Sequence, residues 1–141
     1  MMTISIIFDK SVENVLMCFH TKQGMFNFVG GHVESHENGL EGSYRELEEE
    51  TGITRGDVEL KFVRCESTSS AIYKPYSLYV NCGILDHEVR LREENNSLLW
   101  VPISNVKTLM DETFGNGNCL VYMREALITL GREDLLCKTE I

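Results

Sequence analysis

The stretch that most constrains this chain is residues 30–53, GGHVESHENGLEGSYRELEEETGI. It begins with two glycines and places seven glutamates around a single arginine, Arg45. Residues from about Asn38 onward predict a helix that ends at Gly52, because glycine is typical of helix C-termini. We therefore expect a helix with an unusually acidic surface.

At about 100° per residue, the positions of this helix fall on three faces. One face carries Gly39, Gly42, Glu46, Glu49 and Glu50. A second face, suited to packing on a core, carries Leu40, Tyr44, Leu47 and Thr51. The third carries Glu41, Arg45 and Glu48, and the i,i+4 spacing of Glu41 and Arg45 favours an ion pair.

The three glutamates of the first face lie on adjacent turns, and no lysine on that face offsets their charge. A hard divalent cation such as Mg²⁺ or Mn²⁺ prefers oxygen ligands and would relieve the repulsion. The neighbouring glycines would leave room for a bulky anion beside the metal. The alternative interpretation is an acidic helix face that is simply solvated.

The segment resembles the Nudix box over residues 31–53. Every fixed position of that pattern is present with its spacing: Gly31, Glu37, Arg45-Glu46-Leu47, Glu49-Glu50 and Gly52-Ile53. The chain is thus similar to Nudix hydrolases, and its size is similar to that of MutT-like members. The resemblance implies an α/β fold, an α/β/α sandwich with a mixed sheet and a loop–helix–loop catalytic motif. It also implies a single Nudix hydrolase domain over residues 1–141.

Other segments predict the elements around this helix. Apolar runs with strand-like patterning occur at residues 3–8, 14–19, 25–29, 58–65, 76–85 and 98–101. The first two, joined by a polar turn, are expected to form a hairpin-like pair. Helices are expected at residues 103–110 and 119–130. Strands on both sides of an early helix favour a mixed sheet flanked by helices.

Composition narrows the class of protein. A chain of 141 residues with 43% hydrophobic and 25% charged residues suits one globular domain. The net charge of −9 argues against nucleic acid or an anionic membrane as the main partner. No basic leader or long apolar stretch is present. Five scattered cysteines predict reduced thiols in a soluble, cytoplasmic protein.

The resemblance also implies roles for residues of the box. Glu46, Glu49, Glu50 and the carbonyl of Gly30 are expected to bind Mg²⁺, with Mn²⁺ as the alternative cofactor. Glu49 or Glu46 is expected to act as the general base as well. Glu37 and Arg45 are expected to form a pair that holds the helix to the preceding loop.

Three further box positions have weaker assignments. Glu34 is expected either to support the metal ligands or to be solvated. His32 and His36 lack metal-ligand spacing and are given no ligand role.

Candidates outside the box are fewer. Of Glu93 and Glu94, Glu94 better matches a further base or ligand of the family, and the alternative is an ordinary charged loop. Asn118 stands where MutT-like members place an asparagine that binds the base, and the alternative is a helix N-cap. Phe28 is expected to stack on a base or to lie in the core. His20 is expected to contact phosphate or to be a surface histidine.

Two positions depart from the family's usual pattern. Val29 stands where proline is most common, and Gly42-Ser43 stands where small alanines are usual. Glycine inside a helix costs on the order of 1 kcal/mol relative to alanine.

The resemblance implies hydrolysis of a nucleoside diphosphate linked to a further group X. The sequence lacks the motifs that are typical of ADP-ribose and NADH pyrophosphatases. We therefore expect a MutT-like nucleoside triphosphate pyrophosphohydrolase, with oxidised nucleotides among its candidate substrates. The first alternative is an ADP-ribose, sugar-nucleotide or dinucleotide pyrophosphatase. The others are a catalytically silent nucleotide-sensing module and an enzyme of RNA 5′ ends, which the acidic charge disfavours. The expected partner is a small nucleotide, without a membrane, and the sequence indicates no oligomeric state.

Overall fold

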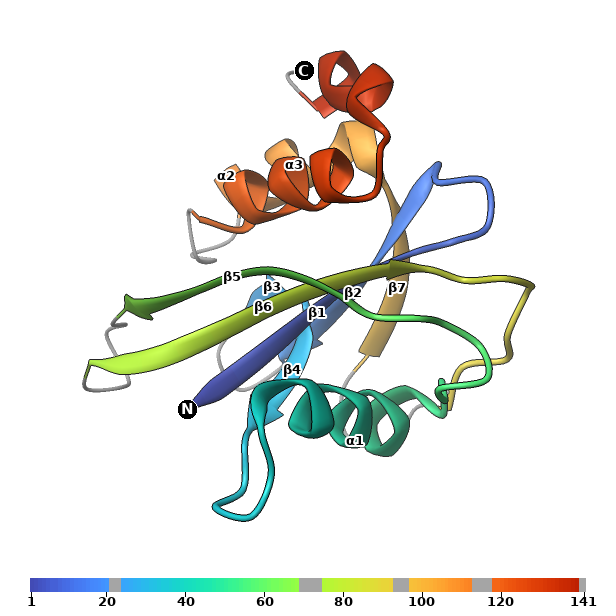
Figure 1. Ribbon diagram of the computed structural model, residues 1–141. Helices are drawn as coiled ribbons and strands as arrows, with labels where there is room; N and C mark the ends of the chain where they lie inside the picture. The colour runs from blue at the N-terminus through green and yellow to red at the C-terminus, as the bar shows by residue number, and fades with distance from the viewer. Residues whose placement is uncertain (21–23, 69–74, 93–96, 113–117, 140–141) are drawn as a thin grey trace.

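The computed structural model describes residues 1–20, 24–68, 75–92, 97–112 and 118–139. Within these ranges a mixed sheet of seven strands lies between helices on its two faces (Figure 1). The predicted α/β/α sandwich is therefore confirmed.

The strands in chain order are β1 (Met2–Phe8), β2 (Asn14–His20), β3 (Met25–Asn27), β4 (Val29–His32), β5 (Lys61–Thr68), β6 (Tyr76–Ile84) and β7 (Ser97–Pro102). Strand β1 is central, because it pairs in parallel with β6 and antiparallel with β2 and β4. Strands β3 and β7 pair with β2, and β5 pairs with β6, all antiparallel. The predicted pairing of the first two strands is confirmed.

Helix α1 (Gly39–Thr51) covers one face of the sheet, and the later helices cover the other (Figure 1). These are a 3₁₀ turn η1 (Ile103–Asn105), α2 (Val106–Glu112), α3 (Cys119–Thr129) and a 3₁₀ segment η2 (Glu133–Thr139). Segment η2 has no counterpart among the predicted elements.

Local sequence fixes both ends of α1. At its start, the Asn38 side chain accepts a hydrogen bond from the backbone N–H of Glu41 at 2.8 Å. The Glu41 carboxylate accepts one from the backbone N–H of Asn38 at 3.0 Å, which completes a capping box. At its end, Gly52 adopts a left-handed conformation with φ of 83°. The helix therefore begins and ends where the sequence predicts.

Alternation along β1 divides the core into two clusters. Ile4, Ile6 and Phe8 belong to the cluster that includes buried residues of α3. Ile7 belongs to the cluster that includes Leu47 of α1. Thr3, which lies on the same face of β1 as Ile7, is also buried but is polar. The surface beneath α1 thus carries a buried hydroxyl beside the sheet's apolar side chains.

Two strands differ from the prediction. Residues 25–32 form two short strands, since the Asn27 side chain accepts a hydrogen bond from the backbone N–H of Phe28 at 2.8 Å and interrupts the ladder. The glycine pair Gly30-Gly31 consequently lies in β4, beside β1, and not in a loop. Strand β5 begins later than expected, at Lys61, and the preceding Val58 is buried under α1.

All five cysteines are free, and Cys18, Cys82 and Cys119 are buried. Burial raises the pKa of the Cys82 and Cys119 thiols to about 12 each, so these side chains are uncharged packing groups. None of the described helices is long and apolar enough to cross a membrane.

Candidate metal-binding and catalytic site

The acidic face of α1 meets strand β4 at the side chain of Glu46. This side chain is only 15% exposed. A Cβ built on Gly31 would lie 2.5 Å from the carboxyl carbon of Glu46 and 2.6 Å from both of its oxygens. The absence of a side chain at Gly31 is therefore what allows the carboxylate to rest against β4.

Gly30 is required for a different reason. Gly30 faces Ile4 in the β1–β4 ladder, and a Cβ on Gly30 would collide with the carbonyl oxygen of Thr3. The glycine pair thus permits two close approaches, one of backbone to backbone and one of a carboxylate to backbone.

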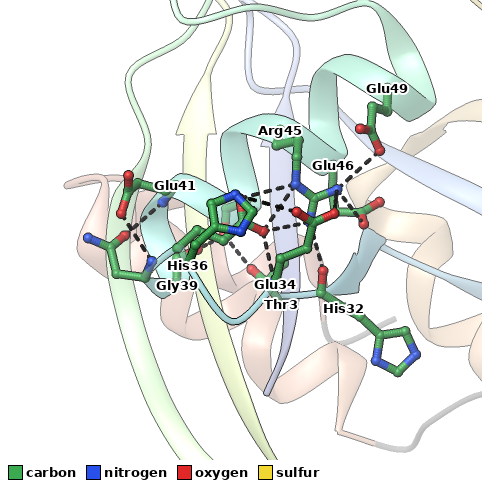
Figure 2. Close-up of polar contacts among 12 residues, drawn as sticks. Thr3, His32, Glu34, His36, Gly39, Glu41, Arg45, Glu46 and Glu49 are labelled. Carbon is green, nitrogen blue, oxygen red and sulfur yellow. Dashed lines mark hydrogen bonds and ion pairs between the residues drawn. The ribbon is translucent and has the colours of Figure 1, made fainter.

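Arg45 joins α1 to the loop that precedes it (Figure 2). Its guanidinium donates from Nε and Nη2 to Glu37 Oε1 at 3.0 and 2.6 Å, and from Nη2 to the carbonyl of His32 at 2.8 Å. Glu37 also accepts from the backbone N–H of Glu34 at 2.9 Å. The Arg45 hydrogen bond, followed by the Glu34 backbone, lowers the pKa of Glu37 to about 2. The predicted pair of Glu37 and Arg45 is present.

The same guanidinium reaches the acidic face. Arg45 Nη1 lies 3.1 Å from both Glu46 Oε1 and Glu49 Oε2 (Figure 2). The predicted ion pair between Glu41 and Arg45 is wrong, because Glu41 is held in the capping box and Arg45 extends toward Glu37.

The negative charges of Glu46, Glu49 and Glu50 on this helix face repel one another. Burial raises the pKa of the Glu46 carboxyl, the Arg45 guanidinium opposes the increase, and the charges of Glu49 and Glu50 add to it. A divalent cation would favour the ionised form of all three carboxylates. Carboxylate and backbone oxygens are also the donors that Mg²⁺ and Mn²⁺ prefer. The donor set therefore fits such an ion.

In this structure the three glutamates are spread apart. Among the residues that the structure describes, Glu34, His36 and Glu37 form the one acidic or histidine group whose ligand atoms all lie within 4.8 Å. Arg45 already neutralises Glu37 there, so we assign no metal to that group. Glu49 is 59% exposed and bound to Arg45, and such a side chain changes rotamer at little cost.

The predicted space beside the helix glycines is absent. A Cβ on Gly39 would meet the ring of Tyr79 on β6 at 2.5 Å. A Cβ on Gly42 would approach Val33 at 3.0 Å and Glu37 at 3.1 Å. Both glycines are buried against neighbouring elements and leave no open surface for an anion, so that expectation is wrong.

The candidates outside the box are placed as follows. Glu93 and Glu94 lie outside the described residues, as does the side chain of His20, whose backbone is in β2. Phe28 is 2% exposed and packs in the larger core cluster, which matches its core alternative.

Asn118 occupies the N-cap position of α3, but its side chain makes no capping hydrogen bond. Instead, it is hydrogen-bonded to the hydroxyl of Tyr122, one turn further along the helix. That hydroxyl also binds Glu66 on β5. The alternative prediction, that the Asn118 side chain caps α3, is therefore wrong.

The sequence did not predict two interactions that α1 makes with distant residues. The Arg92 side chain donates to the carbonyls of Glu48 at 2.7 Å and Glu49 at 3.3 Å, where a cation also complements the helix dipole. Burial of the Cys18 thiol on β2, and then the charge of Glu50, raise the pKa of that thiol to about 11. More than 40 residues separate Arg92 from its partners, so local sequence patterns carried no signal for the contact.

Comparison with known proteins agrees with this architecture. A family model described as the NUDIX domain matches residues 2–119. A C. elegans Ap4A hydrolase structure is similar, with a TM-score of 0.77, 15% identity and coverage of 92% of this chain and 96% of that chain. The E. coli dihydroneopterin triphosphate pyrophosphohydrolase has a TM-score of 0.76, 17% identity and coverage of 91% and 94%. A MutT structure from work on Aliivibrio salmonicida and Vibrio cholerae has a TM-score of 0.67, 23% identity and coverage of 90% and 96%.

No curated protein matches the sequence. The family match nevertheless covers most of the chain and includes the whole box, so sequence and fold define one class, the hydrolases of phosphoric anhydrides. The chain belongs to the Nudix family. The resemblance predicted from the box, including its similarity to MutT-like members, is confirmed.

Proposed function

We propose that this Nudix hydrolase is a nucleoside triphosphate pyrophosphohydrolase, which releases a nucleoside monophosphate and pyrophosphate with Mg²⁺, or with Mn²⁺, as cofactor. The observation that carries the proposal is the largely buried carboxylate of Glu46 against Gly31, followed on the same helix by Glu49 and Glu50. Three carboxylates on one helix face, beside a glycine backbone that has no side chains, suit a metal-bridged polyphosphate.

The residues proposed to hold the cation are Glu46, Glu49, Glu50 and the carbonyl of Gly30. When bound, a divalent cation supplies charge neutralisation for the diphosphate and activation of water. Glu49 is proposed as general base, because its carboxylate is the more exposed of the two candidates, and Glu46 is the alternative.

Arg45 is proposed to support these ligands. Its guanidinium is fixed by Glu37 and by the carbonyl of His32, and from there it contacts Glu46 and Glu49. The pair of Glu37 and Arg45 thus sets the position of the loop and of two carboxylates at once.

Support for a triphosphate substrate comes from two structural relatives, a dihydroneopterin triphosphate pyrophosphohydrolase and MutT. The Ap4A hydrolase gives a dinucleotide as the second candidate substrate.

Substrate contacts are proposed outside the box. Asn118 is exposed at the start of α3, and its side-chain amide can both donate to and accept from a base. His20 is proposed to contact phosphate. Glu94 is proposed as a further base or ligand. In the sequence it comes two residues after Arg92, whose backbone N–H donates to the carbonyl of Thr51 at the end of α1.

We also propose that residues 1–141 form one hydrolase domain and that the protein is cytoplasmic. The five free cysteines support a reducing compartment.

A substrate panel tests the proposal. Nucleoside and deoxynucleoside triphosphates, 8-oxo-dGTP, ADP-ribose, dinucleotides and sugar nucleotides are incubated with Mg²⁺ or Mn²⁺, and products are separated by chromatography. We expect turnover of a triphosphate that Glu49→Gln and Glu50→Gln each abolish. Preferred turnover of a dinucleotide would favour the second candidate, and metal-dependent binding without any product would favour a sensing module.

A further inference from the structure

Three buried polar side chains that are linked by hydrogen bonds lie between α1 and the sheet, each from a different element. They are Thr3 of β1, Ser43 of α1 and Asn81 of β6, and all three are fully buried. The hydroxyls of Thr3 and Ser43 are hydrogen-bonded to each other. Asn81 Nδ2 donates to Ser43 Oγ at 2.6 Å and lies 3.4 Å from Thr3 Oγ1. We call these residues the buried triad.

The hydrogen bonds of the buried triad have a definite direction. The Ser43 hydroxyl donates to the carbonyl of Gly39 at 2.7 Å, so its oxygen is the acceptor for both Thr3 and Asn81. All donors are then used. Asn81 Oδ1 is buried and has no hydrogen-bond partner among the described residues.

A buried acceptor without a partner is unfavourable, and apolar side chains of similar shape would avoid that cost. Stability alone therefore does not explain why polar residues stand here. A network with directional bonds does, however, define one position of a helix on a sheet, whereas an apolar contact tolerates sliding.

The buried triad is connected to the proposed metal site through β4. Thr3 faces Gly31 in the β1–β4 ladder, and Gly31 lies against the carboxylate of Glu46. On α1, Ser43 precedes Glu46 by three residues and Glu50 by seven, so the three share one face. The contacts Ser43–Thr3, Thr3–Gly31 and Gly31–Glu46 form a ring that α1 closes.

The second point of contact between α1 and β6 is less specific. Gly39 packs on the ring of Tyr79, which lies on the same face of β6 as Asn81. A glycine on an aromatic ring is a smooth contact without hydrogen bonds, so the hydrogen bond between α1 and β6 is the one from Asn81 to Ser43 in the buried triad.

We infer that the buried triad positions α1 so that the carboxylate of Glu46 meets Gly31 with the geometry that the divalent cation requires. Thr3, Ser43 and Asn81 are positioning residues, since they are fully buried between α1 and the sheet and act through the helix that carries the carboxylates. The inference rests on the metal site of the proposed function.

The test separates stability from metal affinity. Ser43→Ala leaves the donors of Thr3 and Asn81 without their acceptor. The triple variant Thr3→Val, Ser43→Ala, Asn81→Leu replaces the whole network with apolar groups. For each full-length protein, Mn²⁺ affinity is measured by electron paramagnetic resonance of free Mn²⁺, and the thermal midpoint is measured by circular dichroism.

A matched control removes another buried hydroxyl of α1. Thr51 Oγ1 donates to the carbonyl of Leu47 at 2.6 Å and accepts from the backbone N–H of Ile53 at 3.1 Å, so its bonds stay at the end of the helix. Thr51→Val is expected to lower the thermal midpoint and to bind Mn²⁺ as the wild type does.

Ser43→Ala is expected to lower the midpoint and to weaken Mn²⁺ binding by about tenfold, similar to the loss when a group that orients a metal ligand is removed. The triple variant is expected to recover the midpoint while its Mn²⁺ affinity stays about tenfold weaker. Wild-type Mn²⁺ affinity in either variant would overturn the inference, as would a wild-type protein that binds no Mn²⁺.

Triphosphate turnover, measured in parallel, distinguishes the two claims. If the wild type hydrolyses no triphosphate while the variants lose Mn²⁺ affinity, the proposed substrate is wrong and the inference stands. If the wild type and the triple variant hydrolyse triphosphate equally and bind Mn²⁺ equally, the inference is wrong and the proposed function stands.

Discussion

The carboxylate of Glu46 rests against Gly31, with no room for even a methyl group between α1 and β4. The neighbouring Gly30 is equally constrained, but by the backbone of Thr3. The two glycines therefore differ in what a side chain would displace. At Gly31 it would displace the flexible end of a glutamate, and at Gly30 it would displace a strand.

Gly31→Ala is expected to leave the protein folded and to weaken Mn²⁺ binding by about tenfold, because the displaced group is a proposed metal ligand. Gly30→Ala is expected to lower the free energy of unfolding by about 3 kcal/mol, as overpacking against backbone does. Urea unfolding and Mn²⁺ titration measure the two effects. Equal losses of stability in the two variants would contradict this division of roles.

Acid should weaken the link between Glu37 and Arg45. The folded protein lowers the pKa of Glu37 from 4.5 to about 2, so the pair contributes fully above about pH 4.5 and is lost as the pH falls toward 2. Glu37→Gln is expected to lose less stability than the wild type between these pH values. Urea midpoints at several pH values measure this, with exposed Glu59→Gln as the control. Parallel curves for the wild type and Glu37→Gln would refute the assignment.

The capping box should contribute measurably to α1. Asn38→Ala removes the acceptor for the backbone N–H of Glu41 and is expected to lower the free energy of unfolding by about 1 kcal/mol. Asn38→Asp retains an acceptor and should stay near the wild type. Urea denaturation compares them, and indistinguishable Ala and Asp variants would count against the cap.

Cation binding should stabilise the folded protein. At about 100 times the dissociation constant, Mg²⁺ is expected to raise the free energy of unfolding by about 2.7 kcal/mol. EDTA should reverse the increase, and Glu50→Gln should reduce it. Thermal unfolding with and without the ion measures the effect. An increase of the same size in Glu50→Gln would show that the ion binds elsewhere.

Short-range patterns predicted the parts of the structure that short-range forces determine. Asn38 and Gly52 mark the ends of α1 because caps act within one turn of the helix. The spacing of the box predicted the pair of Glu37 and Arg45 through its family, whereas helix spacing alone favoured Glu41 as the partner. Arg45 instead binds the loop before α1, where the buried carboxylate of Glu37 and the carbonyl of His32 accept its hydrogen bonds.

Contacts between distant segments had no such signal. The strand character of the glycine pair depends on pairing with β1, and the covered face of Gly39 depends on Tyr79 of β6. The bonds of Arg92 to the last turn of α1 and the bonds of Ser43 to Asn81 likewise join residues some 40 positions apart. These contacts depend on tertiary packing, so the hydrophobic periodicity and the secondary-structure propensities of the sequence do not predict them.

The most direct test of the central claim uses one triphosphate. The wild type and Glu46→Gln are incubated with the best triphosphate of the panel and Mg²⁺, and phosphorus NMR follows the products. We expect the wild type to release monophosphate and pyrophosphate in equal amounts and Glu46→Gln to release neither at a comparable rate. Orthophosphate as the first product, or unchanged turnover in Glu46→Gln, would contradict a pyrophosphohydrolase built on this helix.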